Sequence, residues 1–215
     1  MIVSHKHKFI YIHPHKCAGT SITESLLPHL GNKDIVVGVT GDGETLNENS
    51  GKWRNFKHAP ALRIKNEVGD KVWANYFKFS FVRNPFDRCV SWYFWFLQKC
   101  GDGNPHVKNI RKMSFDEFVS SKDFDHIRMK FPFSKQLCKE GVPQTNFIGY
   151  YETLQRDFDK VCDIIGIKKS KLNKSNATKR TLHGSYYSQK SIDLIHEYFA
   201  DDINMYNYTF TGRNQ

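Results

Sequence analysis

A loop near the N-terminus combines a cationic side chain with a glycine and two hydroxyl groups. Lys16 precedes Gly19 by three residues, and Thr20 and Ser21 follow at once. Glycine lets a backbone approach a ligand closely, and the N–H groups at a helix start attract negative charge. The pattern therefore predicts an anion-binding loop, although Gly-Thr-Ser is also a common structural helix cap. The loop is not a G-x-x-x-x-G-K-[ST] motif, in which the lysine follows the second glycine.

A second candidate for anion binding lies at Arg83. This residue follows an apolar run, and Ser91 comes eight residues later, about two helical turns into the next segment. The planar guanidinium fork suits a phosphate, and both residues can reach an anion above the carboxyl edge of a sheet. A structural interpretation is also open: Arg83 pairs with Asp87, and Ser91 is a small residue in an aromatic helix.

A strand–loop–helix unit must carry the first loop. The run Phe9–Ile12 is rich in β-formers and predicts a strand. We expect Thr20 or Ser21 to open a helix that continues to Leu27. Glu24, three residues after Ser21, would complete a capping box there.

A second unit of the same kind must carry Arg83. The run Tyr76–Val82 predicts a buried strand, and Asn84 with Pro85 at the first helical position predicts a helix start. The aromatic segment Phe86–Leu97 forms the body of this helix.

The rest of the chain continues the alternation of strands and helices. Ser114 and Glu117 form a capping box, and residues 146–151 predict a strand. An apolar stripe over 154–165 predicts a helix that ends at Gly166. A last helix carries an apolar stripe of Ile192, Ile195, Phe199, Ile203 and Tyr206. Alternating elements predict an α/β fold: a single domain with a mostly parallel sheet flanked by helices.

Two segments do not fit this alternation. Residues 38–56 are rich in turn formers and predict an exposed loop. Residues 124–144 are basic and contain Pro132, Gly141 and Pro143, so we expect an irregular lid or substrate loop within an insertion at about 98–145.

Composition limits the class of protein. The 215 residues are 39% hydrophobic and 14% aromatic, which suffices for a core and excludes a disordered chain. No run of about 18 apolar residues exists, so we expect no membrane span. The segment Met1–Lys8 is mostly polar and basic and lacks the apolar stretch of a secretory signal. We therefore expect the mature protein to begin near residue 1.

Charge and cysteine content point to a partner and a compartment. The chain has 32 Lys and Arg against 22 Asp and Glu, a net charge of +10. Such an excess is typical of proteins that bind a nucleotide, a nucleic acid, an anionic glycan or a membrane surface, although it also serves solubility. The five cysteines contain no C-x-x-C pair, which argues against a disulfide framework and a zinc site. We expect reduced thiols and a cytoplasmic protein.

Several stretches together resemble the sulfotransferases that use 3′-phosphoadenosine-5′-phosphosulfate (PAPS), particularly the carbohydrate branch. Residues 9–22 (FIYIHPHKCAGTSI) resemble the family's 5′-phosphosulfate loop, and residues 79–93 (FSFVRNPFDRCVSWY) resemble its 3′-phosphate motif. Residues 147–154 and 186–210 are similar as well. The resemblance implies a P-loop-like sulfotransferase fold over residues 1–215.

The resemblance also implies the role of individual residues. The 5′-phosphosulfate would be held by Lys16, Cys17, Ala18, Gly19, Thr20 and Ser21. The 3′-phosphate would be held by Arg83 and Ser91, and a further basic residue of the family corresponds to Arg180. Lys16 would also stabilise the leaving phosphate of the product, 3′-phosphoadenosine-5′-phosphate (PAP). His58 occupies the place where some relatives have a catalytic base, and no metal is required.

Other candidates for the base are His13, His15, Glu152 and Glu24, of which Glu24 is explained more simply by helix capping.

The acceptor would be a hydroxyl group, either of a carbohydrate or of a small phenol such as a tyrosine derivative. The basic run over residues 168–174 is either a solvated loop or a surface that attracts the anionic cofactor or an acidic glycan.

Two other classes of protein compete with this interpretation. A nucleotide kinase-like phosphotransferase would need a magnesium ligand where Arg83 stands. A basic nucleic-acid-binding module would concentrate its lysines on one element with interleaved aromatics, whereas the charge here is spread along the chain. We therefore expect no nucleic-acid partner.

Overall fold

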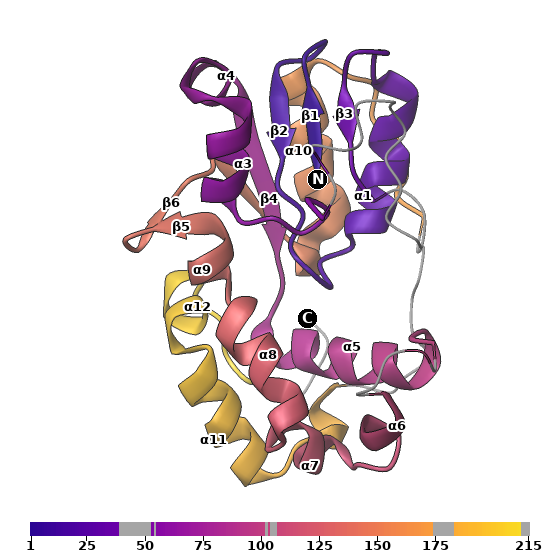
Figure 1. Cartoon of the computed structure of the whole chain (residues 1–215), viewed down its shortest axis with the longest axis vertical. Coiled ribbons are helices and arrows are strands. Elements are labelled where there is room, and N and C mark those ends of the chain that lie inside the picture. The colour runs from indigo at the N-terminus through magenta and orange to yellow at the C-terminus, as the bar shows by residue number, and fades with distance from the viewer. Residues whose placement is uncertain (39–52, 54, 102, 104–106, 174–182, 212–215) are drawn as a thin grey trace. The chain divides into compact units, whose positions relative to one another are not determined.

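The structure is a computed structural model that describes residues 1–38, 53, 55–101, 103, 107–173 and 183–211 (Figure 1). The chain divides into two compact units. The first comprises Met1–Val82 and Phe133–Asn176, and the second comprises Arg83–Pro132 and Ala177–Gln215. The turn-rich segment predicted over residues 38–56 lies mostly outside the described residues.

A five-stranded sheet forms the centre of the first unit, in the order β3-β1-β2-β4-β7. β2 pairs in parallel with β4, and β4 pairs in parallel with β7, whereas β1 is antiparallel to both of its neighbours. The predicted α/β class with a mostly parallel sheet is confirmed. The strands are β1 (Ile2–Ser4), β2 (Phe9–Tyr11), β3 (Ile35–Val36), β4 (Phe77–Val82) and β7 (Phe147–Tyr150).

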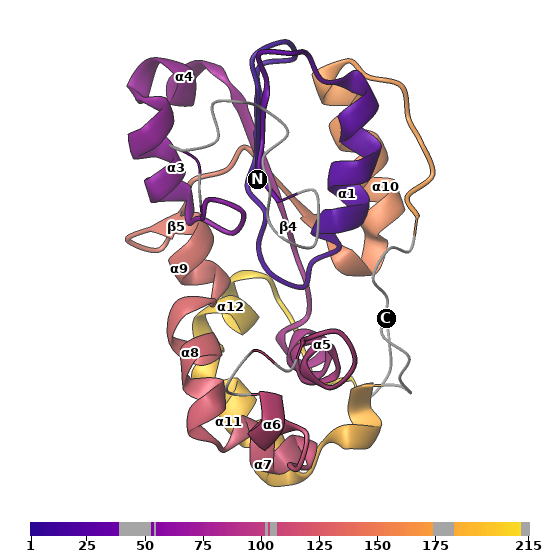
Figure 2. The same cartoon turned by 45° about the vertical axis from the view of Figure 1, so that its right-hand side comes forward.

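Helices cover both faces of this sheet (Figure 2). α1 (Gly19–Leu26) and α10 (Leu154–Ile165) lie on one face, and α3 (Ala61–Val68) and α4 (Asp70–Asn75) lie on the other. Gly166 ends α10 with a left-handed φ of 69°, as predicted. Short 3-10 helices occupy Leu27–His29 and Tyr151–Thr153.

Strand β1 was not expected from the sequence. Its Ile2 and Val3 are fully buried, while the basic residues next to them are confined to the turn that leads into β2. The segment Met1–Lys8 therefore comprises β1 and the turn that leads into β2. The basic residues of this turn make the composition of the segment polar although its strand is apolar.

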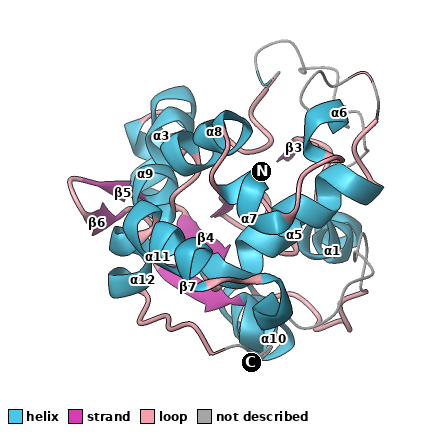
Figure 3. Ribbon diagram, turned by 90° about the horizontal axis from the view of Figure 1, so that it is seen from below, coloured by secondary structure: helices cyan, strands magenta, loops and turns pink. Residues whose placement is uncertain are grey.

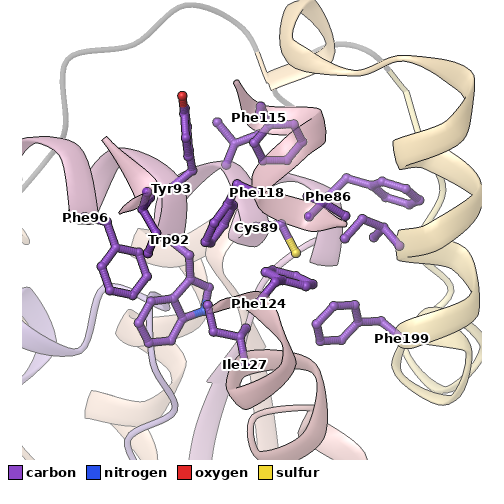
Figure 4. Close-up of a cluster of buried hydrophobic side chains, with 14 of the residues drawn as sticks. Phe86, Cys89, Trp92, Tyr93, Phe96, Phe115, Phe118, Phe124, Ile127 and Phe199 are labelled. Carbon is purple, nitrogen blue, oxygen red and sulfur yellow. The ribbon is translucent and has the colours of Figure 1, made fainter. Parts of the chain in front are cut away.

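The second unit is helical (Figure 3). Its aromatic core is built around α5 (Pro85–Gln98), from which Phe86, Trp92, Tyr93 and Phe96 project into the cluster of Figure 4. The other helices are α6 (Val107–Ile110), α7 (Phe115–Val119), α8 (Lys122–Lys130), α11 (Gln189–Tyr198), α12 (Ala200–Met205) and a 3-10 helix over His183–Tyr186.

Two helix starts were predicted correctly in this unit. The Asn84 side chain accepts a hydrogen bond from the Phe86 N–H at the start of α5, with Pro85 at the first position. Ser114 and Glu117 form both hydrogen bonds of a capping box at α7. The last apolar stripe does not lie on one helix, because the chain leaves helical geometry at Phe199, between α11 and α12.

The expectation of an irregular segment over residues 124–144 is wrong. Its first part is α8, whose buried Phe124 and Ile127 are spaced by three residues, and Pro132 follows the end of this helix. The remainder is α9 (Phe133–Leu137) and a hairpin of β5 (Cys138–Lys139) and β6 (Val142–Pro143). The proline and glycine signals therefore mark the ends of short elements. A role of this segment as a lid stays a prediction.

No helix within the described ranges is both long enough and apolar enough to cross a bilayer.

A close contact between β7 and β4 yields a test of the packing. Gly149 pairs with Phe81, and a Cβ at residue 149 would overlap the buried Phe81 ring. We expect Gly149→Ala to lower the free energy of unfolding by about 1–3 kcal/mol, as overpacking does in other cores, in urea denaturation. Gly101→Ala is the control, because a Cβ there meets nothing within 4 Å. Equal stability of the two variants would show that the Phe81 ring moves aside freely.

Candidate active site

The loop between β2 and α1 has an uncommon backbone. Lys16 and Ala18 adopt positive φ angles of 64° and 59°, whereas Cys17 between them does not. Side-chain-bearing residues seldom occupy this left-handed region. An alternation of this kind turns successive N–H groups toward one concavity, which is the backbone pattern of an anion nest. The positive φ angles at Lys16 and Ala18 are compatible with such a nest, and the anion-binding role stays a prediction.

Helix α1 begins at Gly19, and Ala18 is its N-cap. No side-chain hydrogen bond caps this end. The predicted capping box is wrong, because Ser21 is a buried residue inside the first turn and Glu24 is exposed on the next turn. The positive end of the helix dipole therefore faces the loop without a capping acceptor from the N-cap side chain.

Gly19 is required by a contact with His13. A Cβ at residue 19 would overlap the imidazole ring of His13, so the ring occupies the space that any other residue would fill. The sequence suggested that this glycine gives a ligand access to the backbone. The structure shows that a side chain of the same unit makes the close approach.

His13 is held in place by an extension of the β2–β4 pairing. Beyond the end of β2, the Ile12 N–H donates to the Phe79 carbonyl over 3.0 Å. The Ser80 hydroxyl donates to the Ile12 carbonyl over 2.9 Å. These two buried hydrogen bonds fix the residue directly before His13, and Pro14 after it removes a further degree of backbone freedom.

Three histidines form a cluster beside the loop. The Nδ1 atom of His58 lies 2.8 Å from the carbonyl oxygen of His13. A carbonyl oxygen only accepts, so Nδ1 carries the hydrogen and the lone pair of a neutral His58 is on Nε2. The ring of His15 stacks on that of His58, with centroids 3.5 Å apart, and the His13 ring meets His58 edge-on at 4.6 Å. His58 is therefore in contact with both of the other histidines of the cluster.

Burial keeps His13 neutral. Its side chain is 4% exposed, and desolvation lowers its pKa well below 6.5, with the nearby His58 contributing as the next cause. Its Nδ1 atom is buried without a hydrogen-bond partner. A buried, neutral imidazole of this kind is poorly placed to exchange protons with an acceptor.

Arg83 makes the ion pair that the structural interpretation anticipated. Its Nε donates to Oδ2 of Asp87 over 2.7 Å, and Nη2 contacts the same oxygen. Asp87 lies in the first turn of α5, and Ser91 is one turn further along the helix; all three side chains are buried. The carboxylate fixes the orientation of the guanidinium, which leaves a phosphate-binding role open.

The start of α5 is tied to the C-terminal part of the same unit. Besides capping the helix, Asn84 donates through Nδ2 to the Thr209 carbonyl over 2.9 Å. The Tyr187 hydroxyl donates to the Phe86 carbonyl over 2.8 Å. These hydrogen bonds hold Asn84 and Phe86, which lie close to Arg83 in the chain. The sequence does not predict these contacts.

The remaining candidates are more scattered. Arg180 lies outside the described residues. Glu152 lies in a 3-10 helix and is partly buried. Lys169, in the basic run, pairs with Asp163 over 2.7 Å.

Lys16 and the three histidines belong to the first unit, and Arg83 and Ser91 belong to the second. Within the ranges that the structure describes, no three His, Cys, Asp or Glu side chains are grouped so as to hold a metal ion.

A loop that follows a parallel strand, carries a lysine and leads into a helix is typical of α/β proteins that bind anions. Comparison with known families gives the particular class. The model of the sulfotransferase family matches residues 1–209, and the chain belongs to that family. Membership supports sulfate transfer as its enzymatic chemistry.

Individual relatives agree with this assignment. Carbohydrate sulfotransferase 11 of Mus musculus is 27% identical over 167 residues, which cover 63% of this chain and 47% of that protein. The Rattus norvegicus protein of the same name matches to the same extent. An uncharacterized protein of Archaeoglobus fulgidus is 35% identical over 108 residues, 50% of this chain and 82% of that protein. The chain thus matches about half the length of the two mammalian relatives.

Sequence reasoning missed the contact between His13 and Gly19. A signal for it exists: His13 lies two residues after Tyr11, so both side chains leave the strand on the same side. The strand thus directs the His13 side chain toward the loop between β2 and α1. Only the structure shows that the ring reaches Gly19.

The buried, neutral His13 predicts a dependence of stability on pH. Below about pH 6.5 the unfolded chain takes up a proton at this residue and the folded chain does not, so stability falls as pH falls. The contribution approaches about 1.4 kcal/mol per pH unit until the folded pKa is reached. We expect His13→Gln to remove this component when urea denaturation is measured from pH 7.5 to 5.0. An unchanged slope in the variant would show that His13 is protonated in the folded protein.

Proposed function

We propose that the protein is a PAPS-dependent sulfotransferase that transfers the sulfuryl group to a hydroxyl group of a carbohydrate. The observation that carries the proposal is the lysine-bearing nest at the uncapped start of α1, in a chain of the sulfotransferase family. We propose further that residues 1–215 act as one sulfotransferase domain.

The first-unit loop has the features that a phosphosulfate group needs. When bound, PAPS supplies an activated sulfuryl group whose departure leaves charge on a phosphate. The N–H groups from Cys17 to Ser21 would donate to the anionic oxygens, and Lys16 would balance the charge that develops on the leaving phosphate. Ser21 is buried, so its part would be played by the backbone, whereas Thr20 is partly exposed and can also offer its hydroxyl group.

In the second unit, Arg83 and Ser91 would hold the 3′-phosphate. The ion pair with Asp87 orients the guanidinium before any ligand arrives, which lowers the entropy lost on binding. A planar fork fixed in this way is suited to a tetrahedral dianion. We also assign Arg180 to donor binding, as the family resemblance implies.

His58 is our candidate for the general base. Its hydrogen bond to the His13 carbonyl leaves Nε2 as the atom that would accept the proton of the acceptor hydroxyl group. The alternatives are less suitable: His13 is buried, and Glu24 is an exposed residue of the second turn of α1. His15 stacks on His58 and would support its ring. Lys16 and His58 are therefore the residues to which we assign the chemistry.

The carbohydrate acceptor is proposed from the named mammalian relatives and from the cationic chain. A small phenol or tyrosine derivative is the alternative acceptor. The five cysteines are free thiols, and four of them are buried. Free thiols persist in a reducing compartment, so we propose a cytoplasmic enzyme.

The direct test is transfer of label from [35S]PAPS, in excess chelator, to a panel of neutral glycans, anionic glycans and phenols. We expect a glycan to be labelled, and Lys16→Met to lower turnover strongly because the leaving phosphate loses its cation. Lys33→Met, an exposed lysine of the same unit, is the matched control. Labelling of phenols alone would replace the acceptor class. Absence of PAP binding and of transfer would reject the proposal, and phosphate transfer from ATP and magnesium would favour a phosphotransferase.

Arg83 allows the two ends of the donor to be tested separately. We expect Arg83→Ala to weaken PAP by about 1.5–3 kcal/mol relative to a nucleotide without the 3′-phosphate, because only PAP loses a charge-assisted contact. Calorimetry with both nucleotides measures the difference. Asp87→Asn is the companion variant, since it keeps the guanidinium and removes the partner charge. Equal losses for both nucleotides in Arg83→Ala would mean that Arg83 only supports the start of α5.

A further inference from the structure

A continuous series of ring contacts runs from the sheet to the histidine cluster. Phe79 of β4 stacks on Tyr11 of β2 with centroids 5.1 Å apart, and Tyr11 stacks on His13 at 5.6 Å. His13 meets His58 at 4.6 Å, and His58 stacks on His15 at 3.5 Å. The rings of Phe79 and Tyr11 are fully buried, so the series begins in the buried core of the first unit.

His13 contacts two different parts of the candidate site. Its imidazole ring fills the space above Gly19, at the first residue of α1. Its carbonyl oxygen accepts the hydrogen bond from Nδ1 of His58, in the turn that precedes α3. One residue thus touches the anion-binding loop with its side chain and the candidate base with its backbone.

We propose that His13 is a positioning residue that couples the conformation of the donor loop to the orientation and tautomer of His58. This inference rests on the proposed function, in which the loop holds the donor and His58 accepts a proton. A shift of Gly19 would push the His13 ring, and the ring carries with it the carbonyl that orients His58. The base would then be aligned only while the loop is in its nest conformation.

The surroundings of His13 disfavour protonation of its ring and lower its pKa. His58, His15 and Lys57 all approach it, so a proton on His13 would add a further positive charge next to basic groups. Its ring is packed between Tyr11 and Gly19. The packing on both sides leaves the ring little room to move, so a displacement of Gly19 would be passed on to His13.

The contact with Gly19 can be tested by exchanging the sizes of the two residues. Gly19→Ala should lower the thermal unfolding temperature, because the new methyl group overlaps the ring. His13→Ala in the Gly19→Ala background should restore part of that loss, because it vacates the space. The measurement needs neither donor nor acceptor, and His5→Ala, an exposed histidine of the same unit, is the control. A double variant less stable than the sum of the single changes would overturn the contact.

The coupling to His58 is tested by histidine 15N NMR on the full chain without ligand. We expect His58 in the wild type to show the tautomer with hydrogen on Nδ1, and His13→Ala to show a mixture of tautomers. His13→Asn, which keeps a planar polar group, should lie between the two. An unchanged His58 signal in His13→Ala would overturn the proposal, whatever the protein catalyses.

Turnover supplies a cycle that separates positioning from packing. With labelled PAPS, His58→Ala should lower kcat by about 10²–10⁴-fold, and His13→Ala by up to about 10²-fold through misalignment of the base. The double variant should be no slower than His58→Ala, because a base that is absent cannot be misaligned. Additive losses would overturn the coupling. A His58→Ala variant with normal turnover, combined with the expected tautomer change, would instead reject His58 as the base and leave the coupling of loop and ring intact.

Discussion

The parallel pairing of β2 with β4 is the constraint on which the rest of this molecule depends. Because the two strands run the same way, with Tyr11 opposite Phe79, their carboxyl ends lie at the same edge of the sheet. β2 leads from that edge into the lysine-bearing loop, and the residue that follows β4 is Arg83. The pairing continues through Ile12, which fixes the strand up to the residue before His13. A slip of one residue would turn the His13 ring to the other face and leave the space above Gly19 empty.

The elements with strong local signals could be predicted from sequence, and the contacts that assemble the site could not. Apolar runs located β4 and β7, and Asn84 with Pro85 located the start of α5. The contact of His13 with Gly19 could not be predicted, because the alternation along the strand gives only the direction of the His13 side chain and not the helix residue that it reaches. Residues 124–144 were misread because Pro132 and Gly141 end short elements as readily as they form loops.

Helix α5 shows how one element serves two purposes. Phe86, Cys89 and Phe96 belong to the aromatic core, so the helix cannot shift without opening that core. Asp87 and Ser91 are spaced by four residues on a single side of the helix, and Asp87 holds the guanidinium of Arg83. The aromatic core thereby holds in place the helix that carries Asp87, the partner of Arg83.

Each unit is built from two separate stretches of the chain, and this affects how the protein folds. Asn84 and Thr209, which bond at the start of α5, are 125 positions apart, and Phe86 and Tyr187 are 101 apart. Closing loops of that length costs entropy before any contact repays it, so such pairings slow folding. During synthesis, α6, α7 and α8 can pack on α5 early, but the part of the core that α11 and α12 supply is missing until those helices have left the ribosome. The nascent chain therefore exposes an incomplete apolar core in that interval, which favours aggregation.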